Sequence, residues 1–280
     1  MHAARWAHFR RRMSARTVVY AILAGAGLGV AAVGAYGNAL YLPGGVALVL
    51  AATAIYHWTQ AGGESEREFF ASLAPRLGLA YLVSGGLPPI TPLLSAGNSR
   101  RCTNVMEGPL FGALGGPLCT LAHYEFRTVN EDGRQMPAVP FTVCAMEIDA
   151  ALPVFHGVYL RRRPGFGLGL AVHDWLDRAP RPEPVDLEST DFEELYELLV
   201  ARDQDRLVLH QLFSPSFIVW LSEHPLRPGF ECKAGMLTVF IPEHEGNADH
   251  LTLFHEAARE IARRVIAAVE SARPAVTQAG

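Results

Sequence analysis

Two long apolar runs, separated by a short turn, lie near the start of the chain. The first covers Thr17–Tyr36 and the second covers Leu40–Trp58, and neither contains an aspartate, glutamate, lysine or arginine. A helix rises 1.5 Å per residue, so about 20 apolar residues span a hydrocarbon core of roughly 30 Å. The pattern therefore predicts a transmembrane helical hairpin over residues 17–58.

Arginines around the two runs predict the orientation of this hairpin. Residues 1–16 hold five arginines and no acid, the turn holds no charge, and Arg67 and Arg76 follow the second run. The positive-inside rule then places both termini in the cytoplasm and makes this a two-pass plasma-membrane protein. A signal peptide cleaved near Val33-Gly34-Ala35 is the alternative. An uncleaved hairpin is favoured because the first run exceeds a usual signal-peptide core and a second run follows at once.

Small residues recur at four-residue spacing in both runs. Gly25 and Gly29 form a G-x-x-x-G pair, and the second run offers Ala47 and Ala51. Small residues at this spacing let helix backbones approach closely in lipid. Packing of the two helices against each other is the favoured interpretation, and homodimerisation is the alternative.

Residues 59–100 are expected to link the hairpin to a folded domain. Ser65 and Glu68 have the spacing of a capping box, which predicts a short amphipathic helix that begins after Gly63 and ends near Pro75. The proline-rich segment Leu87–Pro92 predicts an extended connector.

From about Cys102 the hydrophobic pattern changes to the two-residue period of β-strands. In Leu118–Val129 apolar and polar residues alternate, and Asn130–Gly133 has the composition of a turn. The pattern predicts an antiparallel meander of about four strands: Thr103–Leu114, Leu118–Val129, Ala138–Ile148 and Val154–Arg161.

The last third of the chain mixes helical and strand patterns. Asp191–Val200 fits a helix or a strand, Asp203–Phe213 fits a helix, and Ser214-Pro215 has the residues of a helix start. Phe230–Ile241 predicts a hairpin. Asn247 is expected to cap a long amphipathic helix whose buried stripe comprises Leu251, Phe254, Ala258, Ile261, Val265 and Ala268. The prediction is an α+β domain over residues 101–273, with a tail at 274–280.

Composition narrows the choice of function. The formal net charge is −4, and residues 1–16 carry +5, so the remainder carries −9. An acidic domain has no electrostatic attraction to nucleic acid, and no nucleic-acid partner is expected. The four cysteines form no C-x-x-C pair, which favours free thiols in a reducing compartment.

A group of histidines near the C-terminus suggests a metal site at first sight. His255-Glu256-Ala257-Ala258-Arg259 resembles H-E-x-x-H but has arginine in place of the second ligand. His250 and His255 lie roughly 140° apart around a helix, at about 100° per residue. We therefore interpret His244, His250 and His255 as surface residues and expect no metal and no cofactor.

The run Arg161, Arg162 and Arg163 precedes a glycine-rich stretch, Gly165–Gly169. Backbone amides beside arginines bind phosphate or an acidic lipid headgroup in other proteins, so these three arginines are the candidate ligand-binding residues. The stretch matches neither the P-loop nor the dinucleotide fingerprint. The alternative interpretation is a strand end followed by a flexible turn.

No set of catalytic residues stands out. The chain lacks a G-x-S-x-G elbow, and Cys119 and His123 are four residues apart on one strand, too far for direct contact. A Cys–His pair assembled only by folding stays open, without support from the sequence. We name no catalytic residue.

Several segments carry a resemblance to a known group of proteins. They are Asn104–Gly116, Leu152–Phe155, Leu187–Phe192, and Ser214-Pro215 with the apolar stretch to Leu221. In these the chain resembles uncharacterised membrane-anchored proteins of high-GC, actinobacterial-type bacteria, with two N-terminal spans and a cytoplasmic α+β domain. The resemblance implies no catalytic residue, and it implies an extended rather than helical segment at Phe192.

Two classes of function follow. The favoured one is a non-enzymatic, membrane-tethered module that binds a protein, a lipid headgroup or a small ligand at the cytoplasmic face. Its partners would be the lipid bilayer and a second copy or another protein. The alternative is a membrane-associated, hydrolase-like enzyme whose site assembles only in the fold. A pocket holding a perturbed histidine, cysteine or carboxylate would favour the enzyme, and an exposed apolar sheet face would favour the binding module.

Overall fold

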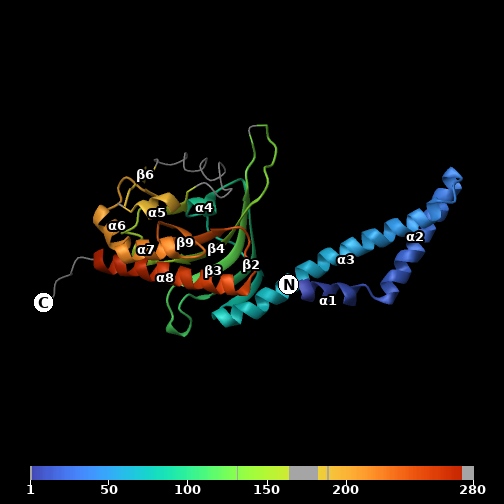
Figure 1. Cartoon of the computed structure of the whole chain (residues 1–280), viewed down its shortest axis with the longest axis horizontal. Helices are drawn as coiled ribbons and strands as arrows, with labels where there is room; N and C mark the ends of the chain where they lie inside the picture. The colour runs from blue at the N-terminus through green and yellow to red at the C-terminus, as the bar shows by residue number, and fades with distance from the viewer. Residues whose placement is uncertain (1, 131, 164–181, 188, 273–280) are drawn as a thin grey trace. The chain divides into compact units, whose positions relative to one another are not determined.

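A computed structural model describes residues 2–130, 132–163, 182–187 and 189–272 (Figure 1). The chain divides into two compact units, Met1–Ser72 and Leu73–Gly280. The first is entirely helical where it is described, and the second holds the sheet. We describe each unit separately.

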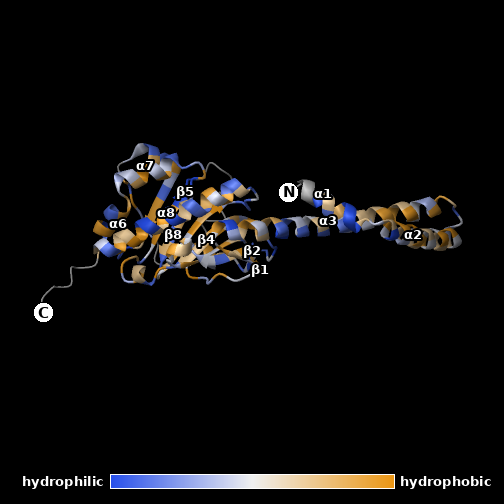
Figure 2. Ribbon diagram, turned by 90° about the horizontal axis from the view of Figure 1, so that it is seen from below, coloured by the Kyte–Doolittle hydropathy of each residue, from blue (hydrophilic) through white to orange (hydrophobic). Residues whose placement is uncertain are grey.

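The N-terminal unit consists of three helices: α1 (His2–Arg12), α2 (Ala15–Tyr36) and α3 (Tyr41–Leu73). Ser14 caps α2 by accepting a hydrogen bond from the Thr17 amide, and Gly37 ends the helix at φ +69°. Both α2 and α3 are long and apolar enough to cross a membrane. Figure 2 shows apolar residues around α2 and the first part of α3. Most of these side chains are exposed, unlike those of a helix in a protein core.

Glycines hold α2 and α3 in backbone contact. A Cβ atom added to Gly25 would lie 2.5 Å from Cα of Val46, and one added to Gly29 would lie 2.6 Å from Cα of Leu42. A Cβ atom at Gly27 would meet nothing within 4 Å. The G-x-x-x-G pair therefore packs α2 against α3, which confirms the prediction that the two helices of the hairpin pack on each other.

The short helix expected to begin at Ser65 does not form as a separate element, because α3 continues through Ala61–Gly63 to Leu73. Gly62 is tolerated inside α3 because the Arg5 side chain of α1 packs over it, 3.2 Å from the place of a Cβ atom. The Arg5 guanidinium also lies 4.3 Å from the centre of the Trp58 ring. The capping-box pattern was wrong here because packing from α1 supports an uninterrupted helix.

The C-terminal unit contains one antiparallel sheet with nine strands in the described chain. Its spatial order is β1-β2-β3-β4-β9-β8-β5-β7-β6. The strands are β1 (Ala80–Ser84), β2 (Ser99–Pro109), β3 (Leu118–Arg127), β4 (Val139–Glu147), β5 (Val158–Arg162), β6 (Glu183–Pro184), β7 (Tyr196–Val200), β8 (Gly229–Lys233) and β9 (Met236–Pro242). The helices and single turns are η1 (Ala74–Leu77), α4 (Pro92–Ser95), η2 (Gly112–Leu114), η3 (Asp149–Ala151), α5 (Thr190–Leu195), α6 (Arg206–Leu212), α7 (Pro215–Glu223) and α8 (Ala248–Ala272).

The predicted α+β class is confirmed, and the four strands of the expected meander all form with shifted ends. The meander itself holds only for β2, β3 and β4, because β9 and β8 lie between β4 and β5, and β5 pairs with β8. The first strand begins at Ser99 instead of Thr103 and ends at Pro109 instead of Leu114. The fourth begins only at Val158, because the chain still turns at residues 152–154 after η3. The two edge strands, β1 and β6, were not predicted.

The ambiguous segment 191–200 is both a helix and a strand. Phe192 lies in α5, which ends where Tyr196 begins β7. The extended conformation that the resemblance implied at Phe192 is therefore wrong. Phe192 is 1% exposed and its ring stacks on that of Tyr196, so a short helix places both aromatic side chains in one core.

The two faces of the sheet are covered differently. One face, which we call the α4 face, carries Ala122, Val143 and Phe240 in a core with Leu93 and Leu94 of α4. The opposite face, which we call the α8 face, lies under α8, which runs across the strands in Figure 1. The six stripe residues predicted for α8 are all buried, and the Asn247 side chain accepts a hydrogen bond from the Asp249 amide as the predicted cap.

Candidate functional site

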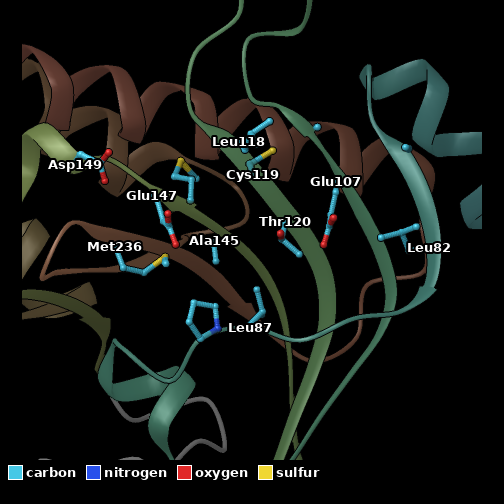
Figure 3. A pocket seen from close by; sticks show the side chains of 14 residues that line it. Leu82, Leu87, Glu107, Leu118, Cys119, Thr120, Ala145, Glu147, Asp149 and Met236 are labelled. Carbon is cyan, nitrogen blue, oxygen red and sulfur yellow. The ribbon is translucent and has the colours of Figure 1, made fainter.

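A groove of about 670 Å³ lies on the α4 face, near the ends of β3 and β4 (Figure 3). Ala145 and Met236 lie at its floor and are 4% and 2% exposed. Leu82 of β1 and Leu87 also line it. Its volume is in the range of ligand-binding pockets, about 300–1,000 Å³.

Three carboxylates surround this apolar floor. Glu107 pairs with Thr120, and Thr120 pairs with Ala145, so these three residues share one face of the sheet. Glu147 follows two residues after Ala145 and points to the same face, with Asp149 beyond it. Figure 3 shows Glu107 and Glu147 on either side of Thr120 and Ala145.

The three carboxylates at the rim of the groove are exposed, and no ion pair among the described residues offsets their charge. Glu107, Glu147 and Asp149 are solvent-exposed. Within the described parts of the chain, none of the three forms an ion pair. Like charges gathered at a partly apolar hollow create a negative potential that attracts cations.

The edge of the sheet beside the groove is formed by β1. Among the described residues only β2 pairs with this strand. It holds no proline and no charged residue, and Leu82 and Val83 are 42% and 54% exposed. Edge strands are usually protected by charge, proline or cover, as Glu183 and Pro184 protect the opposite edge at β6. The β1 edge lacks these protections.

A second cluster lies on the α8 face. Cys119 of β3 pairs with Met146 of β4, and Cys144 is two residues from Met146 on the same face. His255 of α8 packs onto this face and is 3% exposed. The strand alternation turns the Cys119 side chain toward the α8 face, and the residue also belongs to the lining of the groove, as Figure 3 shows.

The thiols of this cluster are electrostatically linked. A hydrogen bond from Cys144 lowers the pKa of the Cys119 thiol, and the neighbouring His255 ring lowers it further. The same contact and burial raise the pKa of the Cys144 thiol well above its ordinary value. Nε2 of His255 is buried and has no hydrogen-bond partner among the described residues.

The prediction that these three histidines lie at the surface was partly wrong. His244 and His250 are exposed, whereas His255 is buried because it follows Leu251 by four residues within the stripe of α8. Glu256 is exposed. Within the described ranges no group of histidine, cysteine and carboxylate side chains has the arrangement of a metal site.

The three candidate arginines do not form one cluster. Arg161 is buried and its Nη2 donates to Oε1 of Glu231 at 3.0 Å. Arg162 follows it in β5, so the strand alternation places it on the opposite face. Arg163 is exposed, and its Nε donates to the carbonyl of Tyr196 at 3.1 Å. Gly165–Gly169 lies outside the described residues, so anion binding at this segment stays a prediction.

No family model and no curated protein matches the chain. Among solved structures, the crystal structure of the mycobacterial trehalose monomycolate transport factor A, TtfA, matches with a TM-score of 0.44 and 11% sequence identity. The match covers 76% of this chain and 98% of that chain. At this TM-score and identity it establishes neither a common fold nor a common function.

Proposed function

We propose that this chain is a two-pass membrane protein whose cytoplasmic sheet domain binds an extended, positively charged segment of a partner protein. The observation that carries the proposal is the acidic groove, which is bordered by the unprotected strand β1. The apolar helices α2 and α3 support the membrane anchor, and the arginines before and after them support the cytoplasmic placement.

Addition of a strand to β1 would explain both the acidic groove and the unprotected sheet edge. A peptide pairing with a free sheet edge gains affinity from main-chain hydrogen bonds and specificity from alternate side chains. Alternate side chains of a strand beside β1 would lie next to Leu82, on the face where the groove opens. Lysine or arginine side chains at those positions would point toward Glu107 on β2, two strands away. Glu147 on β4 lies four strands away, about 19 Å at 4.8 Å per strand, and would act through its charge and not by contact.

The enzyme alternative has one observation in its favour, the Cys119 thiol with its lowered pKa. That thiol lies on the α8 face, however, and the groove lies on the α4 face. Cys119 does line the groove, but the residue is only 1% exposed and strand alternation turns its side chain to the other face. The burial of this thiol favours binding over catalysis.

Peptide binding to the full chain in detergent micelles tests the proposal. We would use a fluorescent peptide Lys-Thr-Leu-Thr-Lys-Thr-Leu-Thr-Lys, which presents lysine and leucine on one face when extended. The matched peptide has glutamate in place of lysine. Anisotropy is expected to show binding of the lysine peptide, and Glu107→Lys with Glu147→Lys should weaken it at least about tenfold, because like charges repel across an interface.

The control variant is Glu256→Lys, which makes the same charge change at an exposed position of α8. It should leave the affinity within about twofold, since a charge outside the interface has little effect. Equal binding of both peptides would contradict the proposal. So would equal weakening by Glu256→Lys and the groove variant.

The cytoplasmic placement is tested separately by thiol labelling. Cys119, Cys144 and Cys232 are buried, so a reporter cysteine is needed at an exposed site, and Leu114, which is 86% exposed, provides it. In intact cells, Leu114→Cys is expected to stay unlabelled by a membrane-impermeant maleimide and to become labelled after lysis. The unchanged chain, with Cys102 partly exposed, gives the background. Labelling of Leu114→Cys in intact cells would contradict this orientation.

A further inference from the structure

We propose that Cys119 and Cys144 form a redox-active dithiol, in which peroxide oxidises Cys119 and Cys144 then closes a disulfide. His255 acts as the positioning residue that stabilises the Cys119 thiolate. This inference rests on the cluster under α8 and is independent of the proposed binding function.

The register of β3 and β4 brings the two thiols together. Cys119 lies opposite Met146 and Leu121 lies opposite Cys144, so the cysteines occupy diagonal positions on neighbouring strands and the same face. The two thiols also shift each other's pKa, downward at Cys119 and upward at Cys144, as neighbouring thiols do. Diagonal positions on adjacent strands are about 7–8 Å apart, just beyond the usual range of a disulfide, so closing the bond needs a small shift of the strands as well as a change in side-chain rotamers.

His255 supplies the feature that activates cysteine in many proteins. An imidazolium beside a thiol favours the thiolate, which is the nucleophilic form. His255 is 3% exposed and its Nε2 has no well-formed hydrogen bond in the described chain. A buried polar atom without such a bond is costly, and an interaction with the thiolate would offset that cost.

The other two cysteines provide internal controls. Burial raises the pKa of Cys102 and of Cys232 to about 12. Thiols with a raised pKa hold little thiolate and react slowly. Cys119 is the second residue of β3 and follows Leu118, which is 74% exposed. A small neutral oxidant therefore has a short path to the sulfur.

The chemistry balances with hydrogen peroxide as the two-electron oxidant. The Cys119 thiolate attacks one peroxide oxygen, an S–O bond forms, the O–O bond breaks, and hydroxide leaves and is protonated to water. The Cys144 sulfur then attacks the sulfenic sulfur of Cys119. The S–S bond forms as the S–O bond breaks, and the hydroxide leaves with the Cys144 proton as a second water.

Peroxide treatment of the reduced full chain in detergent tests this sequence. Mass spectrometry is expected to show a loss of about 2 Da, the two thiol hydrogens, and peptide mapping should place the disulfide between Cys119 and Cys144. In Cys144→Ser the sulfenic acid should persist at Cys119 and be trapped by dimedone. His255→Gln should slow oxidation at least about tenfold by removing the imidazole beside the thiol.

Cys102→Ser and Cys232→Ser are the matched controls and should change the rate less than about twofold. Oxidation of Cys102 before Cys119, or an unmodified Cys119, would overturn the proposal. An unchanged rate in a folded His255→Gln protein would remove the role given to His255. If that variant does not fold, Cys144→Ser still decides, because it replaces a single atom and its product at Cys119 is identified directly.

Discussion

Replacing Arg161 with methionine is expected to lower the free energy of unfolding of the sheet domain by about 3–5 kcal/mol. Glu231, its partner at 3.0 Å, is 0% exposed. Removal of the guanidinium would leave a carboxylate in the core without a counter-charge. Chemical denaturation of the full chain in detergent, followed by circular dichroism, measures the effect.

The size of this effect follows from the position of Glu231 in the fold. Its Oε2 accepts a hydrogen bond from the Leu93 amide at 2.7 Å, so the carboxylate attaches α4 to β8. Burial raises the pKa of Glu231 and lowers the pKa of Arg161, and each charge partly offsets the shift of the other. The pair is thus stable only while both members are present.

Two further variants make this prediction specific. Arg161→Met combined with Glu231→Leu should recover much of the loss, since removing both charges leaves no unpaired ion. Arg163→Met changes an exposed side chain and should cost less than about 1 kcal/mol. If Arg161→Met were no more destabilising than Arg163→Met, the pair would not hold α4 on the sheet.

Gly25→Leu is expected to separate the two apolar helices, at a cost of about 1–3 kcal/mol in helix packing. The new side chain would begin 2.5 Å from Cα of Val46, where no movement of a flexible side chain can make room. Gly27→Leu is the matched control, because a Cβ atom there meets nothing within 4 Å.

Cross-linking across the hairpin measures this separation. Continuing the register of Gly25 with Val46 and Gly29 with Leu42 by one turn places Ala21 near Leu50. An Ala21→Cys/Leu50→Cys pair should form a disulfide under mild oxidation in the wild-type and Gly27→Leu backgrounds, and much less in Gly25→Leu. Equal cross-linking in all three would contradict the packing role of Gly25.

Elements with a strong local signal were predictable from the sequence. The two apolar runs, the β8–β9 hairpin and α8 each have a periodic pattern with its own turn or cap, and the structure confirms them. Strand β1 gave no such signal because it has only five residues in a stretch that reads as a linker. Its extended form comes from pairing with β2, an interaction between segments that local propensity does not encode.

The candidate site residues of the domain were harder to predict from the sequence than its fold. Three consecutive arginines looked like one basic site, but strand alternation divides them and burial pairs Arg161 with a glutamate 70 residues away. The Cys119–Cys144 pair did have a signal. Cys119 lies 11 residues before the predicted turn Asn130–Gly133, and Cys144 lies 11 residues after it, so a symmetric hairpin would place them opposite each other. The observed register is offset by two residues and makes them diagonal neighbours. His255 joins them only through the packing of α8.

Because α3 is continuous, its length fixes how far the chain extends beyond the apolar part of the helix. The helix has 33 residues, and the stretch from Trp58 to Leu73 measures about 22 Å at 1.5 Å per residue. If residues 41–58 lie in the bilayer, as proposed, this stretch is a continuous helix outside it. The ion pair between Arg12 and Glu64 joins α1 to this part of α3. In the proposed membrane arrangement, helix length and not a flexible tether would set the distance between Trp58 and Leu73.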